Sequence, residues 1–217
     1  MTRPEEIEAI NRAQPDFVGF VFAESRRRVT PRQAAALRAL IAPDVVTVGV
    51  FRDAPAPEIA ELVGAGVIGV AQLHGHESAE AVRQLHELVA VPVIKAVSVS
   101  GLASVSVPTP ADPGRATDPA FPADWILFDH GPGGTGRSFD LGLIDRARAL
   151  GLLPAKPFFI AGGLGLGNLN EVLRRLPYGV DVSSGAESDG VKDPDKVRRL
   201  VELVRRQGSG RGTRLET

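Results

Sequence analysis

The chain has 217 residues, is 43% apolar and carries a net charge of −1, which suits one large α/β domain with a real core. Both signs of charge are interspersed and no apolar run approaches 18 residues, so the composition indicates neither a nucleic-acid groove nor a membrane span. The absence of cysteine excludes disulfides, thiolate metal sites and a thiol nucleophile within this chain. The polar N-terminus does not resemble a signal peptide, and the four histidines lack metal-ligand spacing, so we expect a metal-free cytoplasmic protein.

Apolar segments alternate with amphipathic segments along most of the chain. The chain opens on a helix, because Thr2–Glu5 fits a capping box with a proline in the first turn. Nearly continuous apolar runs then predict buried parallel strands at residues 16–22, 45–51, 67–73, 91–97, 124–128, 156–161 and 179–182. Helices are predicted to begin at Thr30–Pro31 and at Asp193–Pro194, and to span residues 57–63, 78–89, 140–150 and 168–176. Their buried faces include Leu40 and Leu88.

This alternation indicates repeated βαβ units around a parallel sheet. An open doubly wound sheet is an alternative. The seven strands that follow an initial helix fit better a (β/α)8 TIM barrel that lacks its first strand. We expect one domain over residues 1–206, a proline-rich irregular connection at about 98–123 and a flexible tail at 207–217.

Candidate functional residues follow the predicted strands, where a parallel barrel places its active site. Asp129 closes an apolar strand, and a carboxyl group there could act as a general acid or simply cap a loop. Arg27 could bind a carboxylate through a fork contact or belong to a solvated basic run. His74 is more often structural than catalytic, and Lys95 could reach the mouth or form an internal salt bridge.

Two neighbouring strands end in turns of small residues. Gly162 and Gly163 follow one strand, and Ser183, Ser184 and Gly185 follow the next. Small side chains leave backbone N–H groups uncovered, and a barrel often binds phosphate between its last two such loops. Ordinary tight turns are the alternative for each, but the pair favours a phosphate site. We expect Asp181 to orient the N–H groups of its loop.

Several of these segments resemble one family, phosphoribosylanthranilate isomerase of tryptophan biosynthesis. The resemblance runs in family order through Gly19-Phe-Val-Phe22, Ser25-Arg-Arg-Arg-Val-Thr-Pro31, Gln72-Leu-His-Gly75, Val93-Ile-Lys-Ala96, Phe128-Asp129, Gly133-Gly-Thr-Gly136, Ala161-Gly-Gly-Leu164, Tyr178-Gly-Val-Asp-Val-Ser-Ser-Gly185, Glu187 and Gly190-Val-Lys-Asp-Pro194.

The resemblance implies an Amadori rearrangement of a small phosphorylated substrate without a cofactor, and the composition already indicates no metal, nucleic-acid or membrane partner. It implies that Asp129 is the general acid, that Arg27 and His74 contact substrate, and that the two small-residue turns bind its phosphate. The glycine-rich loop that contains Gly133, Gly134, Thr135 and Gly136 belongs to the same pattern, and its glycines permit closure over the substrate. The sequence does not decide between a monomeric and a homodimeric state.

The chain departs from the family in one important respect. The family begins with a strand that carries a cysteine general base, and this chain starts after that strand and has no cysteine. Three interpretations follow. The start is assigned too late; or the barrel is degenerate and binds sugar phosphates without turnover; or a related barrel enzyme uses another base, such as His74 or Asp53. The intact remainder of the site favours the first.

Overall fold

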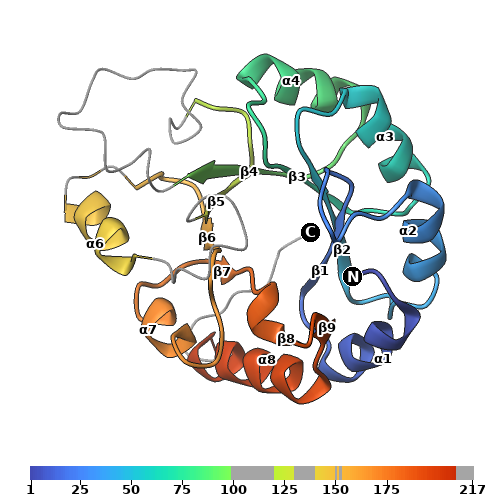
Figure 1. Ribbon diagram of the computed structural model, residues 1–217. Coiled ribbons are helices and arrows are strands. Elements are labelled where there is room, and N and C mark those ends of the chain that lie inside the picture. Colours follow the sequence, from blue (N-terminus) through green and yellow to red (C-terminus); the bar gives the residue numbers. More distant parts are fainter. Residues whose placement is uncertain (99–119, 130–139, 150, 152, 209–217) are drawn as a thin grey trace.

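The computed structural model describes residues 1–98, 120–129, 140–149, 151 and 153–208. Within these residues one parallel sheet runs in chain order, and each strand pairs with the next along the sequence. Its seven strands are β1 (Phe17–Val21), β2 (Val46–Phe51), β3 (Val70–Leu73), β4 (Val93–Ser98), β5 (Trp125–Asp129), β6 (Phe158–Ile160) and β7 (Gly179–Val180). The sheet curves around a central space (Figure 1). The predicted barrel architecture is therefore confirmed.

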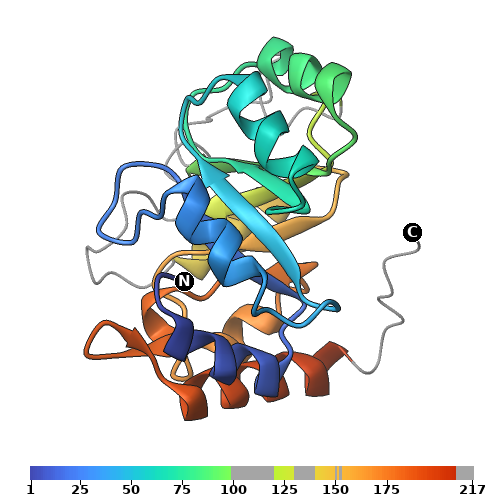
Figure 2. The same cartoon turned by 90° about the vertical axis from the view of Figure 1, so that its right-hand side faces the viewer.

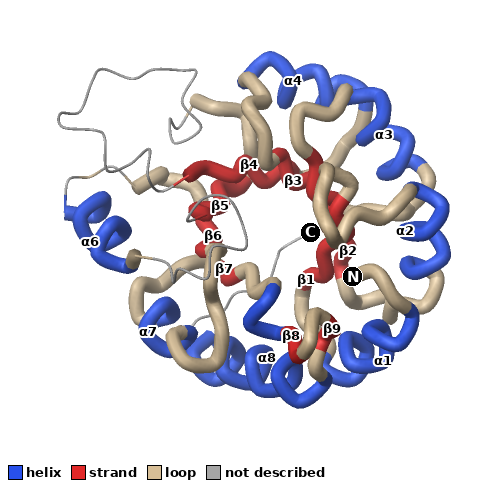
Figure 3. Tube along the Cα trace, viewed as in Figure 1, coloured by secondary structure: helices blue, strands red, loops and turns tan. Residues whose placement is uncertain are grey.

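Helices cover the outside of the curved sheet (Figure 3). They are α1 (Pro4–Ala13), α2 (Pro31–Arg38), α3 (Ala56–Gly64), α4 (Ala79–Leu88), α6 (Leu141–Ala149), α7 (Leu169–Leu173) and α8 (Pro194–Gly208). Helix α8 packs against both α1 and α7, so the two ends of the described chain lie side by side (Figure 2). None of the helices in the described part of the chain is long and apolar enough to cross a membrane.

Strands β1 and β7 are the two edges of the sheet and do not pair with each other within the described residues. The opening between them lies on the side of α8 (Figure 1). The amino group of Met1 donates a hydrogen bond to the carbonyl oxygen of Gly19 on β1 at 3.2 Å, which satisfies one acceptor of that edge.

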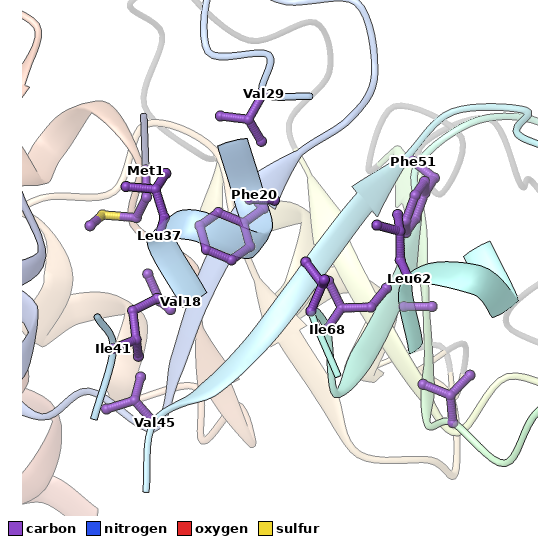
Figure 4. Packing of buried hydrophobic residues seen from close by; sticks show 14 of the residues in the cluster. Met1, Val18, Phe20, Val29, Leu37, Ile41, Val45, Phe51, Leu62 and Ile68 are labelled. Atoms are coloured by element: carbon purple, nitrogen blue, oxygen red, sulfur yellow. The ribbon is translucent and has the colours of Figure 1, made fainter. Parts of the chain in front are cut away.

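The two faces of the sheet bury different residues, as the period of a strand requires. Outward-facing side chains such as Val18, Phe20 and Phe51 pack under the helices, and Figure 4 shows this layer beneath α2 and α3. Inward-facing side chains fill the lower barrel with aromatic rings, and Phe17 lies edge-on to Trp125 and Phe159 at 6.3 and 6.0 Å. The floor is thus apolar, and polar side chains are left to the carboxyl ends of the strands.

Two leucines predicted on buried helix faces are instead exposed. Leu40 is 53% exposed because α2 ends at Arg38, so Leu40 lies in the turn beyond it. Leu88 is 55% exposed because it is the last residue of α4, where the helix leaves the sheet. The first helix also uses a different capping carboxylate: Glu6, rather than Glu5, accepts the N–H groups at the helix start.

Several predicted elements are shorter in the structure, and three are new. The third strand begins at Val70, the helix after β6 spans only Leu169–Leu173, and β7 is half-buried rather than buried. A 3-10 turn η1 (Ser184–Ala186) leads into an antiparallel hairpin of β8 (Glu187–Ser188) and β9 (Val191–Lys192). Residues 207 and 208, predicted to start the tail, still belong to α8. Most of the predicted proline-rich connection lies outside the described residues.

Candidate active site

The inner face of the sheet brings His74 and Asp129 together at the mouth of the barrel. Asp129 ends β5 and shares the inner face with Leu127, while His74 directly follows β3. His74 Nε2 lies 3.1 Å from Asp129 Oδ2, and both side chains are half-buried. The sequence-predicted acid and imidazole therefore form one hydrogen-bonded pair.

A third residue fixes which nitrogen of His74 carries the proton. The Gln72 side-chain amide lies 2.9 Å from His74 Nδ1, and an amide nitrogen can only donate. With the amide nitrogen on this side, Nδ1 accepts, so the neutral ring carries its proton on Nε2 and donates it to Asp129 Oδ2.

Asp181 supplies a second carboxyl group near the mouth, one residue beyond β7. Solvent reaches its side chain, yet the surrounding protein reduces the hydration of the charged form and raises its pKa, and the nearby Asp129 carboxylate raises it further. Among the described residues its carboxyl group has no hydrogen-bond or ion-pair partner, so the expected contact with loop N–H groups is not formed. Asp181 N donates to Ile160 O at 2.9 Å, as part of the sheet.

Arg27 is held at the rim by a carboxylate from the far end of the chain. Its Nε and Nη2 donate to Glu187 Oε1 and Oε2 at 3.0 and 2.9 Å, a bidentate pair. Lys192 Nζ also donates to Glu187, at 3.2 Å. Burial opposes the ionisation of Glu187, but Arg27 and Lys192 outweigh it and lower its pKa. Arg27 is thus ordered and lies where a ligand carboxylate would have to compete with Glu187.

The two small-residue turns lie against each other, as predicted. A Cβ atom added to Gly185 would lie 1.9 Å from the carbonyl oxygen of Leu164 and 2.8 Å from Gly165 Cα, so only glycine permits this approach. Gly162 and Gly163 both adopt positive φ angles, 92° and 63°, which reorient the chain after β6.

Backbone N–H groups and a cation accompany these turns. Within the described residues, the N–H groups of Gly162, Gly163 and Ser183 have no acceptor. Lys192 Nζ donates to Ser183 O at 2.8 Å and places a positive charge beside them. Uncovered N–H groups next to a cation form the kind of concavity that binds an anion.

The other predicted residues have more limited roles in the described structure. Lys95 forms a buried salt bridge with Glu77, as in the second of its two predicted roles, and does not reach the mouth. Asp53 Oδ1 accepts the N–H of His76 at 2.6 Å, at an exposed corner of the rim. The predicted loop residues Gly133, Gly134, Thr135 and Gly136 lie outside the described residues.

Sequence reasoning gave no role to Glu77, Glu187 or Lys192. Lys95 was one available signal, because a lone cation inside an apolar strand requires a buried partner. No cluster of three or more metal-ligating side chains occurs in the described part of the chain. A separate hollow of about 640 Å³, lined by Phe22, Arg28 and Glu58 among others, contains none of the predicted site residues.

Comparison with known proteins points to one family. Residues 1–203 match the family model described as N-(5'-phosphoribosyl)anthranilate (PRA) isomerase. An N-(5'-phosphoribosyl)anthranilate isomerase of Streptococcus pneumoniae (strain Taiwan19F-14) is 39% identical over 211 residues, which cover 97% of this chain and 95% of that protein.

Solved structures agree with this result. The phosphoribosyl anthranilate isomerase of Thermus thermophilus has a TM-score of 0.75 and 34% identity, and covers 97% of this chain and 96% of that one. A phosphoribosyl anthranilate isomerase in complex with reduced 1-(o-carboxyphenylamino)-1-deoxyribulose 5-phosphate has a TM-score of 0.71 and 27% identity, covering 94% and 95% of the two chains. With a family model that spans nearly the whole barrel, this chain belongs to the N-(5'-phosphoribosyl)anthranilate isomerase family.

Proposed function

We propose that this protein is an isomerase of tryptophan biosynthesis and acts in the cytoplasm. It converts N-(5'-phosphoribosyl)anthranilate into 1-(2-carboxyphenylamino)-1-deoxyribulose 5-phosphate by an Amadori rearrangement. The observation that carries the mechanism is the 3.1 Å contact between His74 Nε2 and Asp129 Oδ2 at the mouth. The structural relative that holds a reduced form of this product supports the same substrate class.

Asp129 serves as the general acid in this proposal. It gives its proton to the ribose ring oxygen, the C1–O bond breaks, and the ring opens to a protonated Schiff base. The Asp129 carboxylate left behind accepts the Nε2–H of His74, which stabilises the charge that the step creates. The role of His74 is therefore to stabilise the Asp129 carboxylate, and it does not act as a separate base.

Two anchors orient the substrate around that acid. The paired turns at Gly162–Gly163 and Ser183–Gly185 bind the 5'-phosphate through uncovered N–H groups, assisted by Lys192. Arg27 binds the anthranilate carboxylate, which takes the place that Glu187 holds in the described structure. Because the two anchors bind opposite ends of the substrate, they set the ribose ring over the mouth.

The second proton transfer removes the C2 proton and gives an enolamine that relaxes to the ketone. His74 has both ring nitrogens engaged, and Asp53 accepts from His76 at the rim. The Asp181 carboxyl group has no hydrogen-bond or ion-pair partner among the described residues, so we infer that it is better placed than Asp53 to take this proton. Turnover that survives in Asp181→Asn but is lost in Asp53→Asn would reverse this ranking.

The test is isomerisation by the purified chain and by Asp129→Asn. We expect the variant to lose most turnover and to keep inhibition by inorganic phosphate, because the phosphate turns do not include Asp129. Equal losses of turnover and of phosphate inhibition would make Asp129 structural. If the substrate stabilises the wild-type chain against unfolding but is never converted, the alternative is supported: a sugar-phosphate-binding barrel without turnover.

A further inference from the structure

A buried ion pair lies directly behind the catalytic pair. Lys95 Nζ and Glu77 Oε2 are 2.8 Å apart, with side chains only 6% and 4% exposed. Lys95 shares the outward face of β4 with Val93, so it points away from the barrel interior and toward the helix layer. The pair cannot touch a substrate bound in the mouth.

We propose that Lys95 and Glu77 are positioning residues that set His74 against Asp129; the inference rests on the proposed function of that pair. A buried ion pair is a poor source of stability, because desolvation offsets most of the attraction between the charges. Such a pair can instead fix the positions of nearby groups, since both partners form specific hydrogen bonds. The contacts of this pair converge on the backbone that carries His74.

Lys95 holds the carbonyl groups on both sides of His74. Its Nζ donates to Gly75 O at 2.8 Å and to Leu73 O at 3.3 Å, in addition to Glu77. All three donor positions of the ammonium group are thereby occupied. A neutral or shorter side chain at position 95 would release both carbonyl groups at once.

Glu77 holds the N–H groups of the same loop. Its carboxylate accepts Gly75 N at 3.0 Å through each oxygen, and Asp53 N at 2.8 Å through Oε1. Gly75 also packs closely on Asp53, since an added Cβ would lie 2.4 Å from Asp53 Oδ1. The loop after β3 is therefore fixed to the loop after β2 as well as to β4.

His74 lies between these fixed groups, and its own N–H donates to Phe51 O at 2.8 Å. With its neighbours and its own backbone fixed, its ring meets Gln72 on one side and Asp129 on the other. A shift of the loop would break the Nε2 contact and leave the ring free to change tautomer. A displacement of about 1 Å at a catalytic group can lower the rate on the order of 100-fold.

The experiment compares Lys95→Met and Glu77→Gln with Arg175→Met as a matched control. Arg175, in the turn after α7, forms a more exposed ion pair of the same length, 2.8 Å, with Asp145 on α6, away from the mouth. Each protein is measured for kcat and KM. The ring nitrogens of His74 are followed by 15N–1H NMR, with their signals assigned through a His74→Gln variant.

For Lys95→Met and Glu77→Gln we expect kcat to fall at least about ten-fold while KM changes less than about three-fold. The His74 ring should change from a single Nε2–H tautomer to a mixture. Arg175→Met should alter neither. If Lys95→Met does not fold, Glu77→Gln decides the matter, because its amide oxygen still accepts backbone N–H groups.

The proposal is overturned if the folded variants keep the wild-type kcat and a single His74 tautomer. A wild-type chain without isomerase activity would refute the proposed function alone, because the ring spectra still report whether the ion pair positions His74. A kcat loss of equal size in Arg175→Met would also overturn the proposal, since any lost ion pair would then suffice.

Discussion

Adding one methyl group at Gly185 should disable the phosphate site. The new Cβ would lie 1.9 Å from Leu164 O and 2.8 Å from Gly165 Cα, both of them backbone atoms. Carbon–oxygen contacts normally begin near 3.3 Å, so the two turns must separate by roughly 1.4 Å. No side-chain rotation can relieve the clash, because no side chain is involved. The N–H groups of the two turns would then no longer point toward one bound phosphate.

Two quantities should change in Gly185→Ala. Overpacking of this kind costs about 1–3 kcal/mol, which urea denaturation will show as a lower midpoint. Inhibition of the isomerase by inorganic phosphate should weaken at least about ten-fold, or about 1.4 kcal/mol of binding free energy. Both measurements use the same purified protein, so a folding defect and a binding defect can be separated.

Nearby glycines supply graded controls. Gly167→Ala places its Cβ where no atom lies within 4 Å, and it should behave as wild type. Gly165→Ala meets Gly185 Cα at 3.5 Å, an ordinary contact, and should have a small effect. The reasoning is refuted if Gly185→Ala retains wild-type phosphate inhibition, or if Gly167→Ala weakens it equally.

Three further changes test separate features. Burial opposes the ionisation of Glu6, but the backbone N–H groups of Thr2, Lys192 and Arg3 outweigh it and lower its pKa. The stability this provides is present above the ordinary carboxyl pKa and is lost as pH falls through the folded value. Glu6→Gln should therefore flatten the decline of the urea midpoint below about pH 4.5. Leu85→Ala, in a fully buried site, should cost about 2–5 kcal/mol, whereas exposed Leu88→Ala on the same helix should cost less than about 0.5, both by urea denaturation. Arg27→Ala should chiefly raise KM in steady-state kinetics, and an unchanged KM would remove Arg27 from the site.

The alternation of apolar and amphipathic segments predicted a parallel sheet, and the helix before the seven strands favoured a barrel over an open sheet. Runs such as residues 16–22 are apolar on both faces because helices cover one face and the packed interior fills the other. Strand ends then predicted which side chains share the mouth, and Asp129 and His74 do meet there. The errors at Leu40 and Leu88 have one cause, since a helical pattern does not reveal where the helix leaves the core.

Partnerships between distant loops could not be predicted in this way. Arg27 and Glu187 are separated by 160 residues, and only the curvature of the sheet brings their loops together. Lys95 illustrates a subtler limit: its charge predicts a buried partner, but several nearby carboxylates were available. The choice of Glu77 depends on how the loop after β3 folds back over β4. Such contacts depend on tertiary geometry that no local pattern encodes.

Asp181 allows a last prediction about the relation between stability and function. Its pKa is raised by reduced hydration and by the Asp129 carboxylate, so the folded state binds its proton more tightly than the unfolded state does. The contribution of this group to stability is therefore largest at low pH, falls as pH rises from the ordinary carboxyl pKa through the raised folded value, and stays low above it.

Asp181→Asn removes that charge without changing the size of the side chain. We expect the variant to match wild type in urea denaturation at pH 3 and to be more stable at pH 8, by about 1 kcal/mol or less because solvent reaches and screens the group. A variant less stable than wild type at pH 8 would mean that the carboxylate makes a stabilising bond, contrary to its unpartnered state among the described residues. If turnover falls while stability rises, the charge is retained at the mouth for its chemistry and not for the fold.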